Sequence, residues 1–170
     1  MTLRLHLAQP MLHVETLLSE TDGFQTLTGA PDAATAKDSI HYYAAEDVDH
    51  GTAATEKAKP FPRAIVALGD YSGTGPAATK RVSTGIILRL EKEILPANQT
   101  GSIGSRYLAW LQETETIIDD LWEKALTGSV AGILLNITSI ELSIAPQSRS
   151  TDDNEGAEIW GSEINIGITT

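Results

Sequence analysis

The order of sequence patterns from residue 63 to the C-terminus constrains the fold most strongly. Two strand-like runs come first, RAIVALGD (63–70) and TKRVSTGIILRLEKEIL (79–95). A long stretch with helical periodicity follows over 105–128, and two further strand-like runs cover 133–147 and 158–169. Alternation with a period of two indicates a strand, and a period near 3.6 indicates a helix. The order therefore predicts a small sheet with one helix laid across it.

The second run shows the clearest alternation. Ile86, Leu88 and Leu90 alternate with polar residues such as Arg89 and Glu91. This pattern predicts a half-buried antiparallel strand with one face toward water. The segment 70–79 between the first two runs contains two glycines and a proline, and it predicts a hairpin connection.

The stretch 105–128 predicts an amphipathic helix. Ser105 is a plausible N-cap, while Lys124 in the last turn and Gly128 just beyond it are typical of a helix end. Trp110 lies off the apolar stripe, where it either seals the helix edge or contacts a neighbouring subunit. The stripe expected to be buried consists of Tyr107, Leu111, Ile118, Leu121, Trp122 and Ala125.

The N-terminal part is less regular. Apolar residues at helical spacing after Pro10 predict a short helix over 10–21, and Gly23 lies just past its expected end. No period holds over 28–62, so we expect a long loop insertion with one short strand near 39–44. Tyr42 and Tyr43 in this insertion either contact a partner or pin the loop to its own domain.

These patterns predict one α+β domain over residues 1–170. Its sheet is expected to be four-stranded and mainly antiparallel, with room for an extra strand from the 28–62 insertion. The 105–128 helix and the N-terminal helix pack on it. Between the last two strands, residues 146–156 form a projecting acidic hairpin loop.

Composition excludes several classes of function. The formal net charge is −11 at pH 7, and the chain lacks the clustered Lys and Arg residues that bind phosphates. The acidic wall of a channel can still let DNA pass without binding it. The chain has no Cys, which excludes disulfides and thiolate chemistry. Neither a signal peptide nor a membrane span is evident, so we expect a protein made in the cytoplasm with no membrane partner.

Catalytic patterns are weak. The acidic run from Glu46 to His50 lacks the Gly and the distal Glu of a calcium loop, and a solvated loop explains it better. The segment 69–76 matches neither glycine-rich phosphate motif. Acidic residues in 146–156 are expected to keep that loop soluble rather than to hold a cation. We therefore expect no catalytic residue, no metal and no cofactor.

The order of elements resembles the tail terminator family (tail completion, minor tail protein U-like) of long-tailed bacteriophages. The resemblance rests on the N-terminal helix, on PRAIVALGD before the long strand RVSTGIILRLEKEI, on a helix that ends in Leu-Thr-Gly, and on the closing strand EIWGSEINIGIT. It covers 63–170 and 10–21, and 28–62 departs from it as an insertion.

The resemblance implies a ring, usually a hexamer, at the head-proximal end of the virion tail. Such a ring caps the tail tube, joins the head connector and leaves a channel for DNA. Its partners would be further copies of itself, the major tail tube protein and the neck. The loops would then carry the contacts, and the candidate interface residues are Tyr42, Tyr43, Asp70, Tyr71, Trp110, Arg149, Asp152, Asp153 and Glu155.

Three alternatives remain open at this point. The nearest alternative is another neck component, a head-completion or head–tail joining protein, because such proteins share much of the pattern. A small enzyme would need a cluster of titratable groups, for which the 41–50 loop is the candidate. A monomeric binding module would leave an exposed strand edge, which is a liability, so we favour an oligomer.

Overall fold

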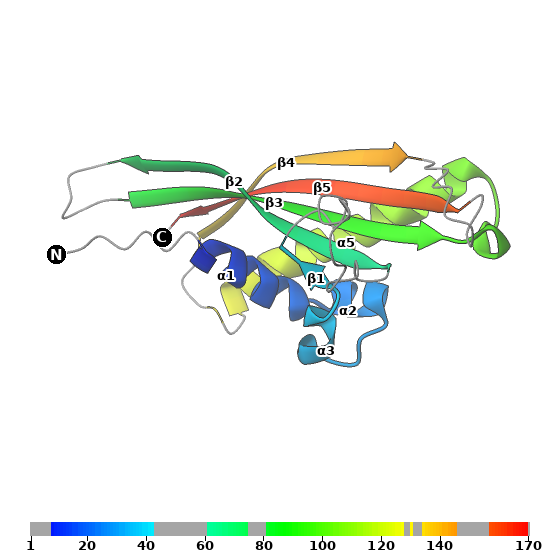
Figure 1. The fold of residues 1–170 in the computed structure, drawn as a ribbon, viewed down its shortest axis with the longest axis horizontal. Coiled ribbons are helices and arrows are strands. Elements are labelled where there is room, and N and C mark those ends of the chain that lie inside the picture. Colours follow the sequence, from blue (N-terminus) through cyan, green and yellow to red (C-terminus); the bar gives the residue numbers. More distant parts are fainter. Residues whose placement is uncertain are drawn as a thin grey trace, which may run out of the picture.

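A computed structural model describes residues 8–42, 61–74, 81–127, 130, 134–145 and 157–169. Helices lie along one face of a single sheet, which confirms the α+β class (Figure 1). The elements in chain order are α1 (Ala8–Ser19), α2 (Asp22–Thr28), α3 (Ala33–Lys37), β1 (Ile40–His41), β2 (Arg63–Thr74), β3 (Arg81–Ile94), η1 (Pro96–Asn98), α5 (Ile103–Thr127), β4 (Leu134–Ala145) and β5 (Glu158–Thr169).

The sheet order is β1-β2-β3-β5-β4. β2 with β3, β3 with β5 and β5 with β4 are antiparallel pairs, but β1 runs parallel to β2 through Ile40 opposite Ala64 and His41 opposite Ile65. The expectation of a mainly antiparallel sheet is therefore wrong, because the sheet is mixed. The extra strand expected from the insertion near 39–44 is confirmed as β1. A parallel neighbour needs a connection of a dozen or more residues, and the segment 42–62 between β1 and β2 supplies one.

Two short helices replace part of the expected loop. The predicted 10–21 helix is α1, and it ends at Ser19. Gly23 is not beyond the last helical turn but inside α2, whose N-cap Thr21 accepts a hydrogen bond from the Phe24 N–H. Further on, the carboxylate of Asp32 accepts the N–H of Thr35 and caps α3. Such caps satisfy backbone donors locally, so they allow helices too short to show a period.

β2 is longer than the predicted strand. Asp70 and Tyr71 lie within it rather than in the hairpin connection, and Tyr71 pairs with Thr84. The register shifts between Leu68 and Tyr71, where β2 carries one more residue than β3. Such a bulge lengthens the ladder past residues that look like a turn, and it increases the local twist.

Glycines of three neighbouring strands lie side by side at this bulge. Gly85 of β3 pairs with Gly167 of β5, and a Cβ on Gly69 would lie 3.2 Å from the Gly85 carbonyl oxygen. β4 has its own register shift nearby, between Ile137 and Ser139. Glycine and bulges favour close approach and strong bending of strands. In the view of Figure 1 the strands overlap at this level, and beyond it they extend past the helices.

α5 packs with a different phase from the predicted one. Trp110 is buried, whereas Trp122, expected in the buried stripe, is 46% exposed. A buried hydrogen bond of 2.8 Å joins Thr114 Oγ1 to Ser162 Oγ of β5, and this polar pair belongs to the packed face. Because the polar Thr114 interrupts the apolar pattern, the predicted buried stripe was displaced to one side of the observed one. The buried residues are Trp110, Thr114, Ile117, Ile118, Leu121 and Ala125.

The start of α5 also differs from the prediction. The helix begins at Ile103, and the Oγ of Ser102 accepts the N–H of Ser105 at 3.1 Å. Ser102 therefore performs the N-cap role that was predicted for Ser105. The helix ends at Thr127, close to the expected end.

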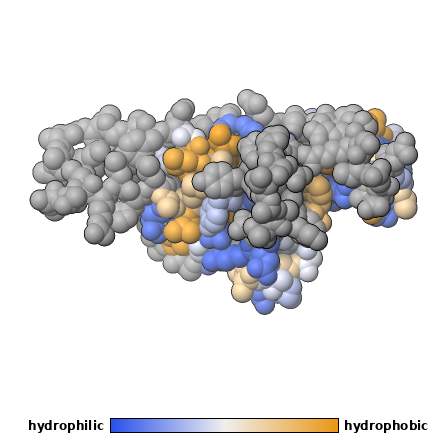
Figure 2. All heavy atoms as spheres, viewed as in Figure 1, coloured by the Kyte–Doolittle hydropathy of each residue, from blue (hydrophilic) through white to orange (hydrophobic). Residues whose placement is uncertain are grey.

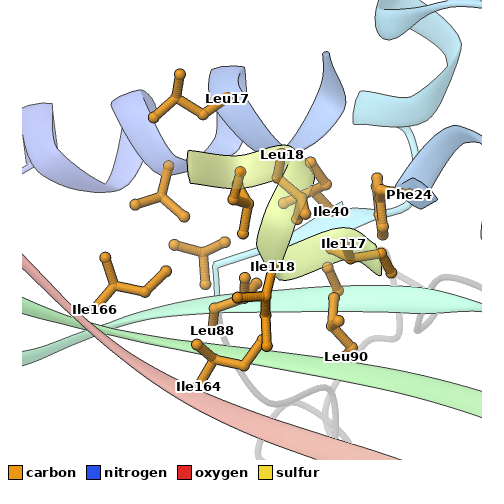
Figure 3. Close-up of a cluster of buried hydrophobic side chains, with 14 of the residues drawn as sticks. Leu17, Leu18, Phe24, Ile40, Leu88, Leu90, Ile117, Ile118, Ile164 and Ile166 are labelled. Atoms are coloured by element: carbon orange, nitrogen blue, oxygen red, sulfur yellow. The ribbon is translucent and has the colours of Figure 1, made fainter. Parts of the chain in front are cut away.

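One continuous core lies between the helices and the sheet (Figure 3). Leu17 and Leu18 of α1 and Ile117 and Ile118 of α5 face the strands, which contribute Leu88 among others. The predicted alternation of β3 is confirmed on this side, where Thr84, Ile86, Leu88 and Leu90 are buried.

The opposite side of β3 is not uniformly wet. Glu91 is 2% exposed, and its Oε2 accepts a 2.7 Å hydrogen bond from Nε of Arg63, which is equally buried. Arg89 Nε lies 3.0 Å from the other carboxylate oxygen. Arg63 and Glu91 are direct cross-strand partners. The predicted water-facing position of Glu91 is therefore wrong, because two guanidinium groups partner its carboxylate.

A substitution at Gly23 tests the packing of α2 on α5. Its N–H donates a 2.7 Å hydrogen bond to Asp120 Oδ2, and an added Cβ would lie 3.0 Å from both that oxygen and Ile117 Cγ1. We expect Gly23→Ala to lower the free energy of unfolding by roughly 1–3 kcal/mol through overpacking, measured by urea denaturation.

The matched control is Gly104→Ala in the first turn of α5. There an added Cβ meets only Ser102 Oγ, at 3.8 Å. This control should be neutral or stabilising by up to about 1 kcal/mol. Equal effects of the two substitutions would contradict the described packing of α2 on α5.

Candidate functional site

Among the described residues, long stretches on both sides of the sheet have no strand partner. β4 pairs only with β5 among the described residues, so its outer edge has no strand partner there. β1 covers β2 only at Ala64 and Ile65, and residues 66–74 of β2 have no described strand on their outer side. Unpaired strand edges present rows of backbone donors and acceptors that can add another strand. These edges are the first candidate for a functional surface.

An apolar patch borders the β2 edge. Leu12 of α1 is 42% exposed and Leu68 of β2 is 40% exposed. Figure 2 shows apolar side chains gathered over α1 and the adjacent part of β2. The exposure of Leu68 also indicates that solvent reaches this part of the edge. A patch next to an open edge offers apolar contact to any strand that is added.

The outer face of α5 is a second apolar surface. Trp122 and Leu126 are one turn apart, and Leu126 is 85% exposed. Leu108 falls on the same side, because its separations from these two residues are close to whole numbers of turns. Exposed acidic residues such as Glu115 and Asp119 interrupt the row. The surface is therefore mixed rather than a continuous apolar stripe.

A pocket of about 310 Å³ lies between the end of β3 and the first turns of α5. Arg106 Nη2 donates to Glu158 Oε1 at 2.6 Å, and Lys92 Nζ donates to Glu113 Oε1 at 2.7 Å. These ion pairs neutralise both cations within the pocket. Its lining residues are Lys92, Glu93, Ile94, Asn98, Thr100, Arg106, Ala109, Trp110, Glu113 and Trp160.

Glu158 is the most clearly perturbed group near this pocket. The hydrogen bond from Arg106 is the main cause that lowers the pKa of its carboxyl group, and the Trp160 indole N–H, which donates to Oε2 at 3.1 Å, lowers it further. A carboxylate held ionised by a partly buried guanidinium joins the start of α5 to the start of β5. This arrangement is structural, because the carboxylate is already saturated by donors.

Trp110 belongs to the pocket but also to the core. It is 3% exposed, and its Nε1 has no hydrogen-bond partner in the described part of the chain. Of the two roles considered for Trp110, sealing the edge of the helix matches its burial. A role at a subunit interface stays a prediction.

Tyr42 packs partly buried against the core. Burial raises the pKa of its phenol to about 12, and a hydrogen bond and the negative charge of Glu15 add to the shift. The contact ties the segment after β1 to α1, which matches the reading that Tyr42 pins the insertion to its own domain. Its predicted contact with a partner remains untested.

The other predicted interface residues are scattered. Asp70 and Tyr71 are placed by the backbone of β2 at the bulge, beside the open edge. The predicted interface residues that lie outside the described part of the chain are Tyr43, Arg149, Asp152, Asp153 and Glu155. The sequence reasoning missed Leu12 and Leu68, because an isolated Leu in an amphipathic pattern carries no sign of exposure.

Among the residues with described positions, no three His, Asp or Glu side chains gather in a way that could hold a metal ion. The acidic run from Glu46 to His50 lies outside them. His13 of α1 has a lowered pKa because it is partly buried, and its Nε2 contacts Gln9. No helix within the described ranges is long and apolar enough to cross a membrane.

Comparison with known proteins adds no assignment: no family model matches the chain, and no curated protein matches it.

Glu158 gives a prediction of pH dependence. Because its folded-state pKa lies below the ordinary value of 4.5, the ionised carboxylate stabilises the fold above about pH 4.5. This stabilisation is lost as the pH falls through the folded-state pKa. We expect Glu158→Gln to lower Tm at pH 7 by roughly 2–4 °C and to flatten the fall of Tm between about pH 5 and 3.

Glu115→Gln on the exposed side of α5 controls for the loss of one negative charge. Melting curves followed by circular dichroism would check both variants. A Glu158→Gln protein with the acid sensitivity of the unsubstituted chain would show that the Arg106–Glu158 pair does not stabilise the fold.

Proposed function

We propose that the chain is a structural subunit of a phage tail, a tail terminator that assembles into a ring, with six copies as the expected number. The observation that carries the proposal is that, among the described residues, the outer edge of β4 and residues 66–74 of β2 have no strand partner. A subunit with two different unpaired edges can make head-to-tail contacts with two neighbours, and such contacts generate a closed ring when the rotation between copies closes.

The charge of the chain suits this role. Each copy carries a formal charge of −11, and the clustered cations that hold nucleic acid are absent from the described pocket, where Lys92 and Arg106 are paired with carboxylates. An acidic ring repels the phosphate backbone. DNA would pass through its channel without being held.

The mechanism we propose is geometric. One face of the ring would match the stacking surface of the major tail tube protein, and the other would present a different surface to the head connector. Tube growth would stop because the second face does not accept another tube ring. The mixed apolar and acidic face of α5, with Trp122 and Leu126 exposed, is a candidate for one of these inter-ring contacts. The site of action would be the head-proximal end of the virion tail.

The solution mass tests the proposal directly. We expect light scattering after size exclusion to give a closed species of about six times the 18.2 kDa chain mass. A monomer that assembles only when isolated tail tubes are added would support the proposal equally. A protein that stays monomeric over a wide concentration range and ignores tubes and connectors would refute it.

A further inference from the structure

We infer that β4 of one subunit adds to the outer edge of β2 in the next, so that each junction of the proposed ring is a continuous β-sheet. The partner is a second copy of this chain. The inference rests on the proposed function, because it names the surfaces by which the ring would close.

Strand direction is the first argument. β2, β3, β5 and β4 alternate in direction, because each of the three pairings between them is antiparallel. β4 therefore runs opposite to β2 within one subunit. When a sheet continues into a neighbour of the same orientation, β4 meets the neighbour's β2 as an antiparallel pair. The junction thus repeats the hydrogen-bonding geometry that joins the long strands inside the subunit.

The lengths of the two edges match. The open part of β2 covers residues 66–74, and β4 covers Leu134–Ala145. Each edge contains one bulge, between Leu68 and Tyr71 in β2 and between Ile137 and Ser139 in β4. A pairing over the open part of β2 would span roughly 30 Å at about 3.3 Å per residue. This is as long as an ordinary strand pairing inside a domain.

Apolar complementarity is the second argument. The backbone register pairs β4 with Ile164 and Trp160 of β5, which are buried on the helix side of the sheet. Leu68 belongs to the same side of β2, since it is two residues beyond the buried Val66. A continued sheet would place the neighbouring copy beside Leu68 and Leu12, which are both exposed in the single chain.

A two-fold pairing of β4 with β4 explains less. It would use one edge, leave residues 66–74 of β2 open, and leave Leu12 and Leu68 in water. It would also give a closed dimer, since a two-fold contact is satisfied by two copies. Pairing β4 with β2 uses both edges and the patch, and every copy makes the same two contacts.

Hydrogen exchange at single-residue resolution tests the inference on the full chain. In the isolated ring, alternate amides of β4 and of 66–74 in β2 should exchange at least about tenfold more slowly than in the dilute monomer. Alternation is expected because every second N–H of an edge strand points outward. Protection of β4 without protection of β2 would indicate a β4–β4 contact and would overturn the inference.

The outcomes separate the inference from the proposed function. A ring whose β2 and β4 edge amides exchange as in the monomer would refute edge pairing and leave the terminator proposal standing. Failure to form any assembly, with or without tail tubes, would refute the proposed function and the inference together.

Substitutions in the patch give an independent test. Leu12→Glu, at an exposed position of a helix, should raise the concentration needed for half-assembly by at least about tenfold, and Leu68→Asp should do the same. Ile103→Glu at the start of α5, where Ile103 is 54% exposed, is the matched control and should change it by less than about twofold. Loss of the ring in the Ile103→Glu variant alone would overturn the inference. Circular dichroism of each variant would show whether the monomer is folded.

Discussion

The pairing of β3 with β5 is the constraint on which the rest of the structure depends. It runs from Ser83 opposite Thr169 to Ile94 opposite Glu158, and it joins two hairpins that flank α5 in the chain. Because the second strand of each hairpin occupies the centre, the first strand of each, β2 and β4, is placed on the outside. The β3–β5 pairing therefore accounts both for the position of α5 on the core and for the strand edges that lie outermost. Any ring built through those edges depends on this central pairing.

A buried ion pair fixes the register of β2 on the central strand β3. Arg63 and Glu91 face each other across the β2–β3 pair on the side away from the helices. A slip of β2 by one residue would turn Arg63 to the helix side, toward Leu90 and its neighbours, and leave Glu91 buried without its partner. A buried ion pair adds little net stability, but breaking it is costly. The pair thus penalises wrong registers, and it keeps the open part of β2 in a defined position.

The presence and order of the long strands and of α5 were predicted correctly, because each shows its period over many residues. It failed at short or polar elements. α2 depends on the Thr21 cap and on the contact of Gly23 with Asp120, which is 97 residues away in sequence, and no local pattern reveals such a contact. The phase of α5 was misjudged because Thr114 is buried by its hydrogen bond to Ser162. For the candidate site, the sequence pointed to the loops and only in general terms to the strand edges. The order of strands in the sheet cannot be deduced from single hairpins.

In the proposed ring, the acidic charge and the strand edges would act together to control assembly. An unpaired edge the length of β4 would invite pairing with any exposed strand. A charge of −11 on every copy opposes all contacts between copies, in whatever orientation they meet. Only a contact that forms many hydrogen bonds and buries apolar residues such as Leu12 and Leu68 can exceed that repulsion. Charge repulsion acts in every orientation, whereas strand addition requires one geometry. In the proposed ring, their combination would favour one closed arrangement over disordered aggregates.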